Sequence, residues 1–400
     1  MNILIVKLSA LGDIIHTLPS LTALRQLYPA AHITWVVEEA AADLVKNHPY
    51  LDAVLISRRK SWSKGFRRGQ FRRSWKEIRF FIKTIRQRPY DLVIDFHGLF
   101  KSSIIVFLSG GKRKLGYDSL QELSGLFLNE KIPEEMNKHA VERYLDFPRY
   151  LGAKIDRVQF VLPSNKEAEE KTLILMDKYN LEDKKFIAIN PIAYWETKLW
   201  SNEKFAHLAD LINDKLQMKV VFTGSEKEPI EKITSLMTTE GINSGGETTL
   251  LELASLYKKA RIVITTDSGP MHLAAAVETP VIALFGPTDP ARTGPYGAGH
   301  TIIRAELPCS PCFLKKCSTK KCMEDISPQQ VFAAVERKLT KECGMPLNKQ
   351  LLEILVCPQC HGKVHFDEKL SGIICDQCKL IYEVKDDIPV MLVEEAKKLS

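Results

Sequence analysis

The chain has 400 residues, of which 45% are hydrophobic and 26% are charged. This balance is typical of a folded globular protein and excludes extensive disorder. The length suits two domains of ordinary size plus a small third one. No run of about 18 apolar residues occurs, so the sequence predicts no membrane-spanning helix. The first residues lack the basic start of a signal peptide, which favours a cytoplasmic protein.

The net charge of +7 is concentrated in one segment. Residues Arg58 to Arg88 include 13 basic side chains and one acid, so this segment carries +12 and the rest of the chain −5. Within Arg67–Arg88, apolar residues recur every three or four positions, which predicts an amphipathic basic helix. The basic face of this helix has three interpretations: it binds nucleic acid, it binds an anionic membrane surface, or it is simply exposed to solvent. The apolar stripe predicts core packing on that side in each case; it consists of Phe71, Trp75, Ile78, Phe81, Ile82 and Ile85.

Short apolar runs without polar alternation predict strands that are buried on both faces of a parallel sheet. In chain order, these strands are expected at Ile3–Leu8, Ile33–Val37, Ala53–Ile56, Leu92–Phe96, Phe186–Asn190, Val220–Thr223, Ile262–Thr265 and Val281–Phe285. Helical patterns occur at Asp13–Leu27, Glu203–Leu216, Glu226–Thr239, Leu250–Lys258, Met271–Val277 and Pro328–Lys341. The alternation predicts an α/β protein with two Rossmann-like halves that face a cleft.

The segment Lys7–Asp13 joins the first predicted strand to the first predicted helix. Gly12 allows the backbone to approach a neighbour closely. Asp13 has two interpretations. It is either a carboxylate that faces the cleft as a general base, or an ordinary acidic residue that complements the helix dipole.

Four loops in the second half also follow predicted strands. Free N–H groups at Asp267–His272 suit a diphosphate, although a simple helix cap explains the same residues. Lys198 can neutralise a leaving phosphate, and Glu226 can hold a ribose. The loop Phe285–Pro290 is either a further ligand loop or a plain turn. All four loops are expected at the carboxyl edge of one sheet, where a single nucleotide site needs them.

Nine cysteines lie between Cys309 and Cys378. Two C-x-x-C pairs, Cys357/Cys360 and Cys375/Cys378, are separated by 14 residues. This spacing predicts four thiolates around one structural Zn²⁺, in preference to a redox pair or idle thiols. A second group consists of Cys309, Cys312, Cys317 and Cys322. Its spacing is compatible with three alternatives, namely a bound metal, an iron–sulfur cluster or labile disulfides.

The motifs together, in their order and spacing over residues 1–342, resemble glycosyltransferase family 9, the ADP-heptose:lipopolysaccharide heptosyltransferases, and within it the type that adds the first heptose. They are S-A-L-G-D-I-I-H-T-L-P at Ser9–Pro19, R-R-K-S-W at Arg58–Trp62, V-I-D-F-H-G-L-F-K-S at Val93–Ser102, H-A-V-E-R at His139–Arg143, K-L-W at Lys198–Trp200 and T-D-S-G-P-M-H-L at Thr266–Leu273. The resemblance implies a GT-B fold and an inverting transfer of heptose from ADP-heptose to a Kdo residue of Kdo-lipid A, at the inner face of the inner membrane.

The resemblance also implies roles for individual residues. Asp13 is the general base, and no catalytic metal is needed. The donor is bound by Gly12, Thr197, Lys198, Glu226, Asp267, Ser268, Gly269 and His272. The anionic acceptor is expected to contact Arg58, Arg59, Lys60, Lys64 and Lys101, which favours a membrane lipid over nucleic acid as the partner of the basic segment.

The last 50 residues, with the closing D-x-I-P-V-x-L at Asp386–Leu392, resemble the small Trm112-like zinc ribbons that activate methyltransferases. This likeness implies a binding module and a possible methyltransferase partner. The expected domains are therefore 1–164 on the acceptor side, 165–342 for the nucleotide sugar, and 349–400 as the ribbon. Alternatives are a second-type heptosyltransferase, another nucleotide-sugar-dependent enzyme or epimerase of GT-B shape, and a non-catalytic scaffold whose ribbon recruits a methyltransferase.

Overall fold

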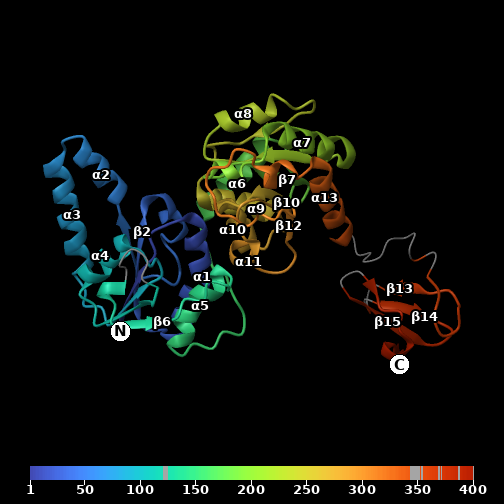
Figure 1. The fold of residues 1–400 in the computed structure, drawn as a ribbon, viewed down its shortest axis with the longest axis horizontal. Coiled ribbons are helices and arrows are strands. Elements are labelled where there is room, and N and C mark those ends of the chain that lie inside the picture. The colour runs from blue at the N-terminus through green and yellow to red at the C-terminus, as the bar shows by residue number, and fades with distance from the viewer. Residues whose placement is uncertain are drawn as a thin grey trace. The chain divides into compact units, whose positions relative to one another are not determined.

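The computed structural model describes residues 1–119, 125–342, 352, 355–367, 370, 372–385 and 388–399. They form two compact units, 1–331 and 332–400. The first unit contains two parallel sheets and the second contains a small antiparallel one (Figure 1).

The first sheet has the strand order β3-β2-β1-β4-β5-β6, with every neighbouring pair parallel. Its strands are β1 Asn2–Val6, β2 His32–Glu38, β3 Ala53–Ser57, β4 Leu92–Asp95, β5 Arg113–Tyr117 and β6 Glu130–Ile132. The helices between and after them are α1 Leu11–Leu27, η1 Glu39–Leu44, α2 Arg59–Arg67, α3 Phe71–Ile85, α4 Phe100–Ser109 and α5 Ala140–Tyr150. The strand order reverses beside β1, and ligands bind at such switch points in open α/β sheets.

The second sheet repeats this topology in the order β12-β11-β10-β7-β8-β9. Its strands are β7 Phe186–Asn190, β8 Lys219–Phe222, β9 Ile242–Asn243, β10 Ile262–Thr266, β11 Val281–Phe285 and β12 Thr301–Arg304. The accompanying helices are α6 Lys166–Lys178, η3 Glu196–Lys198, α7 Asn202–Leu216, α8 Glu228–Thr234, α9 Leu250–Lys259, α10 Gly269–Ala276, α11 Pro290–Thr293 and α12 Lys321–Glu324. Helix α13, Pro328–Glu342, begins in the first unit and continues into the second. Because all these strands are parallel, the loops after β7, β8, β10 and β11 share one edge, as predicted.

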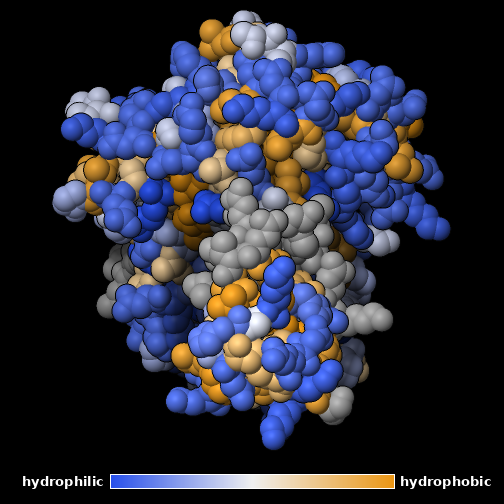
Figure 2. All heavy atoms as spheres, turned by 90° about the vertical axis from the view of Figure 1, so that its right-hand side faces the viewer, coloured by the Kyte–Doolittle hydropathy of each residue, from blue (hydrophilic) through white to orange (hydrophobic). Residues whose placement is uncertain are grey.

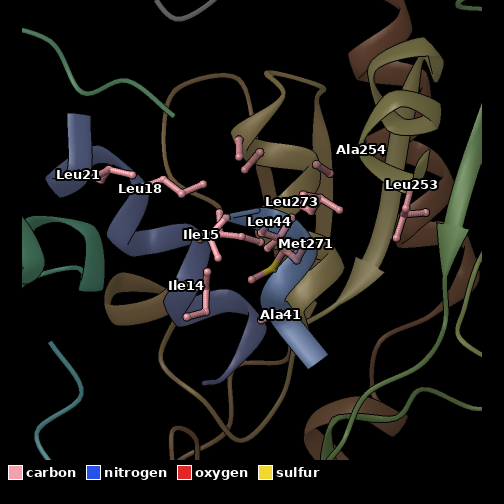
Figure 3. Packing of buried hydrophobic residues seen from close by; sticks show 14 of the residues in the cluster. Ile14, Ile15, Leu18, Leu21, Ala41, Leu44, Leu253, Ala254, Met271 and Leu273 are labelled. Atoms are coloured by element: carbon pink, nitrogen blue, oxygen red, sulfur yellow. The ribbon is translucent and has the colours of Figure 1, made fainter. Parts of the chain in front are cut away.

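Side chains from both halves of the first unit join one hydrophobic cluster. Ile14, Ile15 and Leu18 of α1 belong to it together with Met271 and Leu273 of α10 (Figure 3). Burying aliphatic side chains of this size contributes about 1.5–3 kcal/mol each. The start of α1 is therefore held against the start of α10 by packing.

The basic segment departs from its prediction. It forms two helices, α2 and α3, which run side by side as a hairpin, and α4 packs against α3 (Figure 1). The hairpin turns at Gly69, whose φ of +74° favours glycine. Phe81 and Ile85 are buried as expected, but Phe71 and Trp75 are 57% and 58% exposed. The prediction that the whole apolar stripe packs into the core is thus wrong at its N-terminal end, because α3 extends past the sheet that covers its C-terminal half.

Other differences are local. Helix α8 is shorter than the predicted Glu226–Thr239, so Glu226 lies in the loop after β8. Strands β5, β6, β9 and β12 and helices α4, α5 and α6 were not predicted.

The second unit has strands β13 His365–Asp367, β14 Gly372–Cys375, β15 Leu380–Lys385, β16 Ile388–Pro389 and β17 Lys397–Lys398, with the short helix η4 Val393–Glu395. Its strand pairs are antiparallel. Cys357, Ile373, Cys375, Leu380 and Tyr382 form its own buried cluster. The predicted start of this domain, residue 349, lies outside the described residues.

Among the described residues, no helix is both long enough and apolar enough to cross a bilayer. The face shown in Figure 2 is mostly hydrophilic, and its hydrophobic residues are scattered over small areas.

Candidate active site

Asp13 lies in the first turn of α1, directly beyond the carboxyl end of β1. The Tyr144 hydroxyl donates to its Oδ1 at 2.9 Å, and the Ala10 N–H donates to its Oδ2 at 3.2 Å. The Asp13 side chain is nevertheless 39% exposed, so one side of the carboxylate is hydrogen-bonded to the protein and the other side is open to solvent.

Lys7 supplies the positive charge behind Asp13. Its Nζ is 3.8 Å from Asp13 Oδ2 and donates to the Phe96 carbonyl at 2.9 Å and to the Tyr144 hydroxyl at 2.6 Å. Burial by itself raises the pKa of Asp13, but Lys7, Tyr144 and the Ala10 N–H outweigh it, and the pKa of Asp13 is lowered from its usual value. Asp13 is therefore an ionised carboxylate near neutral pH.

The start of α10 touches the start of α1. A Cβ on Gly12 would lie 2.5 Å from His272 Cδ2, and a Cβ on Gly269 would lie 2.6 Å from Leu11 Cδ2. Both glycines are thus needed for helix-to-helix approach, and Gly269 meets Leu11 instead of an open ligand space. His16 Nε2 and His272 Nδ1 are 2.9 Å apart at this contact. Burial lowers the pKa of His272 to about 4, so its ring is neutral at pH 7.

Lys198 and Asp267 form an ion pair of 2.6 Å, in which the side chains are 15% and 5% exposed. The Thr288 hydroxyl donates to the same Asp267 Oδ2 at 2.6 Å, so the loop after β11 contributes to the arrangement. The Lys198 Nζ also lies 4.5 Å from the centre of the Trp195 ring. Three loops of one sheet edge thereby hold a single cationic side chain in place.

The remaining predicted donor residues differ in what they contact. The Thr197 hydroxyl is buried and donates to the Leu314 carbonyl at 2.7 Å. Ser268 is the N-cap residue of α10, and its Oγ lies 3.3 Å from Thr265 Oγ1. Glu226 is exposed in its loop. His272 is 7% exposed and is bonded to His16.

The predicted acceptor cations gather around one buried acid. Glu38, at the end of β2, is 4% exposed and lies 3.3 Å from Arg59, 3.6 Å from Lys60 and 3.9 Å from Lys101. Lys101 also donates to Ser9 Oγ at 3.1 Å, which places this cation cluster beside the Asp13 loop. Arg58 pairs with Glu39 at 3.2 Å, and Lys64 is exposed on α2.

The four ribbon cysteines are brought together as predicted. The sulfur atoms of Cys357, Cys360, Cys375 and Cys378 all lie within 4.8 Å of one another. Tetrahedral Zn²⁺ with Zn–S distances of about 2.3 Å needs sulfurs about 3.8 Å apart, and the Cys360–Cys375 and Cys357–Cys378 separations are 3.5 and 4.0 Å. The donor set fits Zn²⁺. The Tyr382 hydroxyl lies 3.2 Å from Cys357 Sγ and would steady that ligand.

The other cysteine group is not gathered in this way. Among the described residues, the ribbon cysteines are the one set of three or more side chains with ligand atoms close enough to share a metal. Cys309, Cys312, Cys317 and Cys322 are free thiols. Cys322 lies near the other three, because Cys312, Cys309 and Cys317 add to the effect of burial in raising the pKa of its thiol.

Several side chains at the site were not predicted, namely Lys7 as a charged partner, His16, Glu38, Tyr144 and Thr288. Tyr144 directly follows the H-A-V-E-R motif, and Thr288 lies within the loop Phe285–Pro290. Proximity to these segments is the one feature of the sequence that could have pointed to Tyr144 and Thr288 as site residues. Their partners are remote in sequence, and a single sequence contains no record of such contacts.

Comparisons with known proteins agree with this geometry. The family model described as glycosyltransferase family 9 (heptosyltransferase) matches residues 78–323, and a Trm112p-like model matches residues 348–387. Lipopolysaccharide heptosyltransferase 1 of Pseudomonas aeruginosa is 30% identical over 346 residues, covering 81% of this chain and 90% of that protein. Its counterpart in Escherichia coli K12 is 28% identical over 328 residues, covering 76% of this chain and 94% of that protein.

Solved structures show the same fold. E. coli heptosyltransferase WaaC with ADP matches with a TM-score of 0.69 at 26% identity, covering 84% of this chain and 100% of that one. The two parallel sheets are thus those of a GT-B enzyme, and the homology supports heptose transfer in lipopolysaccharide synthesis. The chain belongs to glycosyltransferase family 9, the heptosyltransferases, and carries an additional Trm112p-like domain.

Proposed function

We propose that the protein transfers heptose from ADP-heptose to a Kdo residue of Kdo-lipid A, with inversion at the anomeric carbon. The observation that carries the proposal is the placement of the ionised Asp13, at a helix start that packs directly on the start of α10. A carboxylate from one sheet and an anion-binding loop from the other therefore meet at one place.

On the acceptor side, Asp13 is the general base. As the acceptor hydroxyl oxygen bonds to the anomeric carbon of heptose, its proton passes to the Asp13 carboxylate. Because the pKa of Asp13 is lowered, this carboxylate is a weak base, and it accepts the proton late in the reaction, when the hydroxyl has become acidic. Lys7 and Tyr144 keep the carboxylate ionised and oriented.

On the donor side, the bond between the anomeric carbon and the diphosphate breaks, and ADP leaves with the electron pair. Lys198 and the N–H groups at the start of α10 balance the charge that develops on the diphosphate. Gly12, Thr197, Glu226, Asp267, Ser268, Gly269 and His272 complete the proposed donor site, several of them through the contacts described above and not by touching the nucleotide. A solved relative, E. coli WaaC, has been crystallised with ADP-2-deoxy-2-fluoro heptose, which supports this donor.

The acceptor is anionic, since Kdo carries a carboxylate and lipid A carries phosphates. Arg58, Arg59, Lys60, Lys64 and Lys101 are proposed to bind it. Glu38 neutralises one of these charges and fixes the positions of three. A lipid acceptor of this kind places the enzyme in the cytoplasm, peripheral on the inner membrane. The division into residues 1–164, 165–342 and 349–400 is part of the same proposal.

The test is incubation of the purified full-length protein with ADP-heptose and Kdo₂-lipid A, followed by mass analysis of the lipid. One added heptose residue supports the proposal, and the Asp13→Asn variant serves as the negative control. Transfer from a UDP-sugar but not from ADP-heptose, or transfer to an acceptor that already carries heptose but not to Kdo₂-lipid A, would overturn the assigned donor or acceptor.

We further propose that the Trm112p-like domain contains one structural Zn²⁺ and binds a methyltransferase. The four gathered sulfurs and the family match support this, and the family assignment of the larger part argues against a non-catalytic scaffold. We expect about one zinc per chain, lost in Cys375→Ser and retained in Cys312→Ser. A methyltransferase that copurifies with the wild type and not with Cys375→Ser supports the partner, and copurification with both variants alike rejects it.

A further inference from the structure

We propose that the outward face of α3 docks the enzyme on an anionic phospholipid bilayer. This surface, termed the α3 face, consists of Phe71, Arg72, Trp75, Lys76, Arg79, Phe80 and Lys83. The inference rests on the proposed function in one respect, because it presumes that the acceptor lies in a membrane.

Three large aromatic side chains on α3 are unusually exposed. Phe71, Trp75 and Phe80 are 57%, 58% and 69% exposed. The opposite side of the helix, with Ser74, Phe81 and Ile85, is already buried. The exposed rings therefore add little to the core, and apolar groups gathered on a surface in this way mark interaction sites.

The cations of α3 lie between these rings. At 3.6 residues per turn, Trp75 and Phe80 project about 140° apart around the helix axis. Arg72, Lys76, Arg79 and Lys83 project within that arc, and all four are exposed. An outward face that alternates basic and aromatic side chains is typical of helices that lie at a membrane surface, with the rings among the headgroups and the cations on the phosphates.

The charge of the α3 face is not compensated by neighbouring acids. Glu77 is the one acid between Arg58 and Arg88, and its carboxylate already pairs with Arg73 at 3.2 Å and accepts from Trp62 Nε1 at 3.1 Å. Among the described residues, no ion pair involves Arg72, Lys76, Arg79 or Lys83. Such a cluster is attracted to anionic lipid headgroups.

An apolar groove continues the surface toward the proposed acceptor site. A cavity of about 530 Å³ lies between α3 and β3 and is lined by Val54, Ile56, Trp62, Phe80 and Phe81, with Arg58 and Lys76 among its polar neighbours. Phe80 and Lys76 belong to the α3 face, and Arg58 to the proposed acceptor cations. The groove favours lipid over nucleic acid, because its aliphatic wall at Val54 and Ile56 offers acyl chains a packing surface and bases no aromatic ring to stack on. Docking through α3 would bring the headgroup region to the cations that select the acceptor.

The test is cosedimentation of the full-length protein with phosphatidylcholine vesicles, with and without phosphatidylglycerol. We expect binding to the anionic vesicles that falls at high salt. The variants Trp75→Ser/Phe80→Ser and Arg72→Gln/Lys76→Gln/Arg79→Gln/Lys83→Gln should each weaken it at least tenfold. The matched control is Leu173→Ser/Ile174→Ser, which removes two similarly exposed apolar side chains from α6 and should leave binding unchanged. Equal melting temperatures show that the variants fold.

Wild-type vesicle binding by both α3 variants would overturn the inference. So would equal binding to neutral vesicles, or α3-dependent binding to an RNA oligonucleotide without binding to vesicles. Heptose transfer to a detergent-solubilised acceptor separates this inference from the proposed function. Heptose transfer without vesicle binding would refute the docking surface and leave the proposed function intact. Vesicle binding through α3 without heptose transfer would refute the proposed acceptor chemistry and leave the docking surface intact.

Discussion

Each sheet of the first unit has an aspartate where one of its strands leads into a helix, and the two aspartates have opposite environments. Asp13 follows β1 and Asp267 follows β10, each beside the start of a helix. The side chain of Asp13 is 39% exposed, while that of Asp267 is 5% exposed and is bonded to Lys198 and Thr288. Both are aspartates at strand-to-helix junctions, so partners and exposure decide which carboxylate is available to react.

The two environments favour two different roles for the aspartates. Asp13 has its cation, Lys7, behind it and an open side in front, which suits proton transfer. Asp267 is nearly buried and binds a lysine and a threonine through one carboxylate oxygen, Oδ2, which suits the positioning of a charge. The following substitutions test whether that division holds.

The largest effect is expected at Asp13. Asp13→Asn keeps the side-chain shape and removes the base, so kcat should fall about 10²–10⁴-fold. Binding of ADP, measured by calorimetry, should change little, because the Asp13 carboxylate is hydrogen-bonded to Tyr144 and Ala10 and to none of the proposed donor residues. Turnover near the wild-type level would remove Asp13 from the role of base.

Asp267→Asn should act on the donor. Without that carboxylate Lys198 loses its partner and its position. A donor KM about 10- to 100-fold higher is expected, equal to about 1.4–2.7 kcal/mol, which is below the cost of breaking a fully buried ion pair because Lys198 is 15% exposed. Lys198→Gln should be at least as severe, and the double variant should be less than additive. Tighter donor binding by Asp267→Asn would instead mean that Asp267 competes with the diphosphate for Lys198.

Tyr144→Phe should have a moderate effect through Asp13. The variant removes two hydrogen bonds of the hydroxyl, one to Asp13 and one from Lys7. Loss of the bond to Asp13, worth about 0.5–1.5 kcal/mol, corresponds to a fall in rate of about 2- to 13-fold. The same bond lowers the pKa of Asp13, so its loss raises that pKa and should move the acid limb of the kcat/KM profile to higher pH. A rate loss with an unmoved acid limb would indicate a purely structural role for Tyr144.

The smallest effect is expected at the contact that joins the two aspartates' helices. Burial lowers the pKa of His16 well below its usual value and that of His272 to about 4, whereas an unfolded histidine titrates near 6.5. The unfolded state thus binds more protons, and this part of the stability is complete above about pH 6.5 and is lost as the pH falls toward about 4. His16→Asn should show a smaller drop in Tm between about pH 7.5 and about pH 5.5 than the wild type. An unchanged or larger drop would contradict this.

The sequence alone predicted the central strands of each sheet and the edge strand β3. FIAIN and VIALF became β7 and β11 at their predicted limits, because uninterrupted apolar runs are buried on both faces. Strands such as RKLGY and TIIR were missed, because strands near a sheet edge keep exposed positions and lose that signal. The apolar stripe of α3 led to a wrong prediction of burial at Phe71 and Trp75. Its periodicity identifies a helix but does not show whether another part of the protein covers the apolar side.

At the site, the sequence predicted the positions of Asp13, Lys198 and Asp267 and the meeting of the four ribbon cysteines. It did not predict that Lys198 pairs with Asp267, or that Tyr144 reaches Asp13 across 131 positions of sequence. Such pairings are set by how the helices cross between the sheets, which local patterns do not encode.

Gly12 and Gly269 have a consequence for how the enzyme can vary. A single added methyl group at Gly12 would push α1 away from α10, because the His272 ring occupies the space that the methyl group needs. Reacting atoms need to approach within about 3–3.5 Å. The substitution would therefore move the proposed acceptor side away from the proposed donor side without altering any charged group. Two small residues, distant in sequence, thus set how closely the starts of α1 and α10 approach each other.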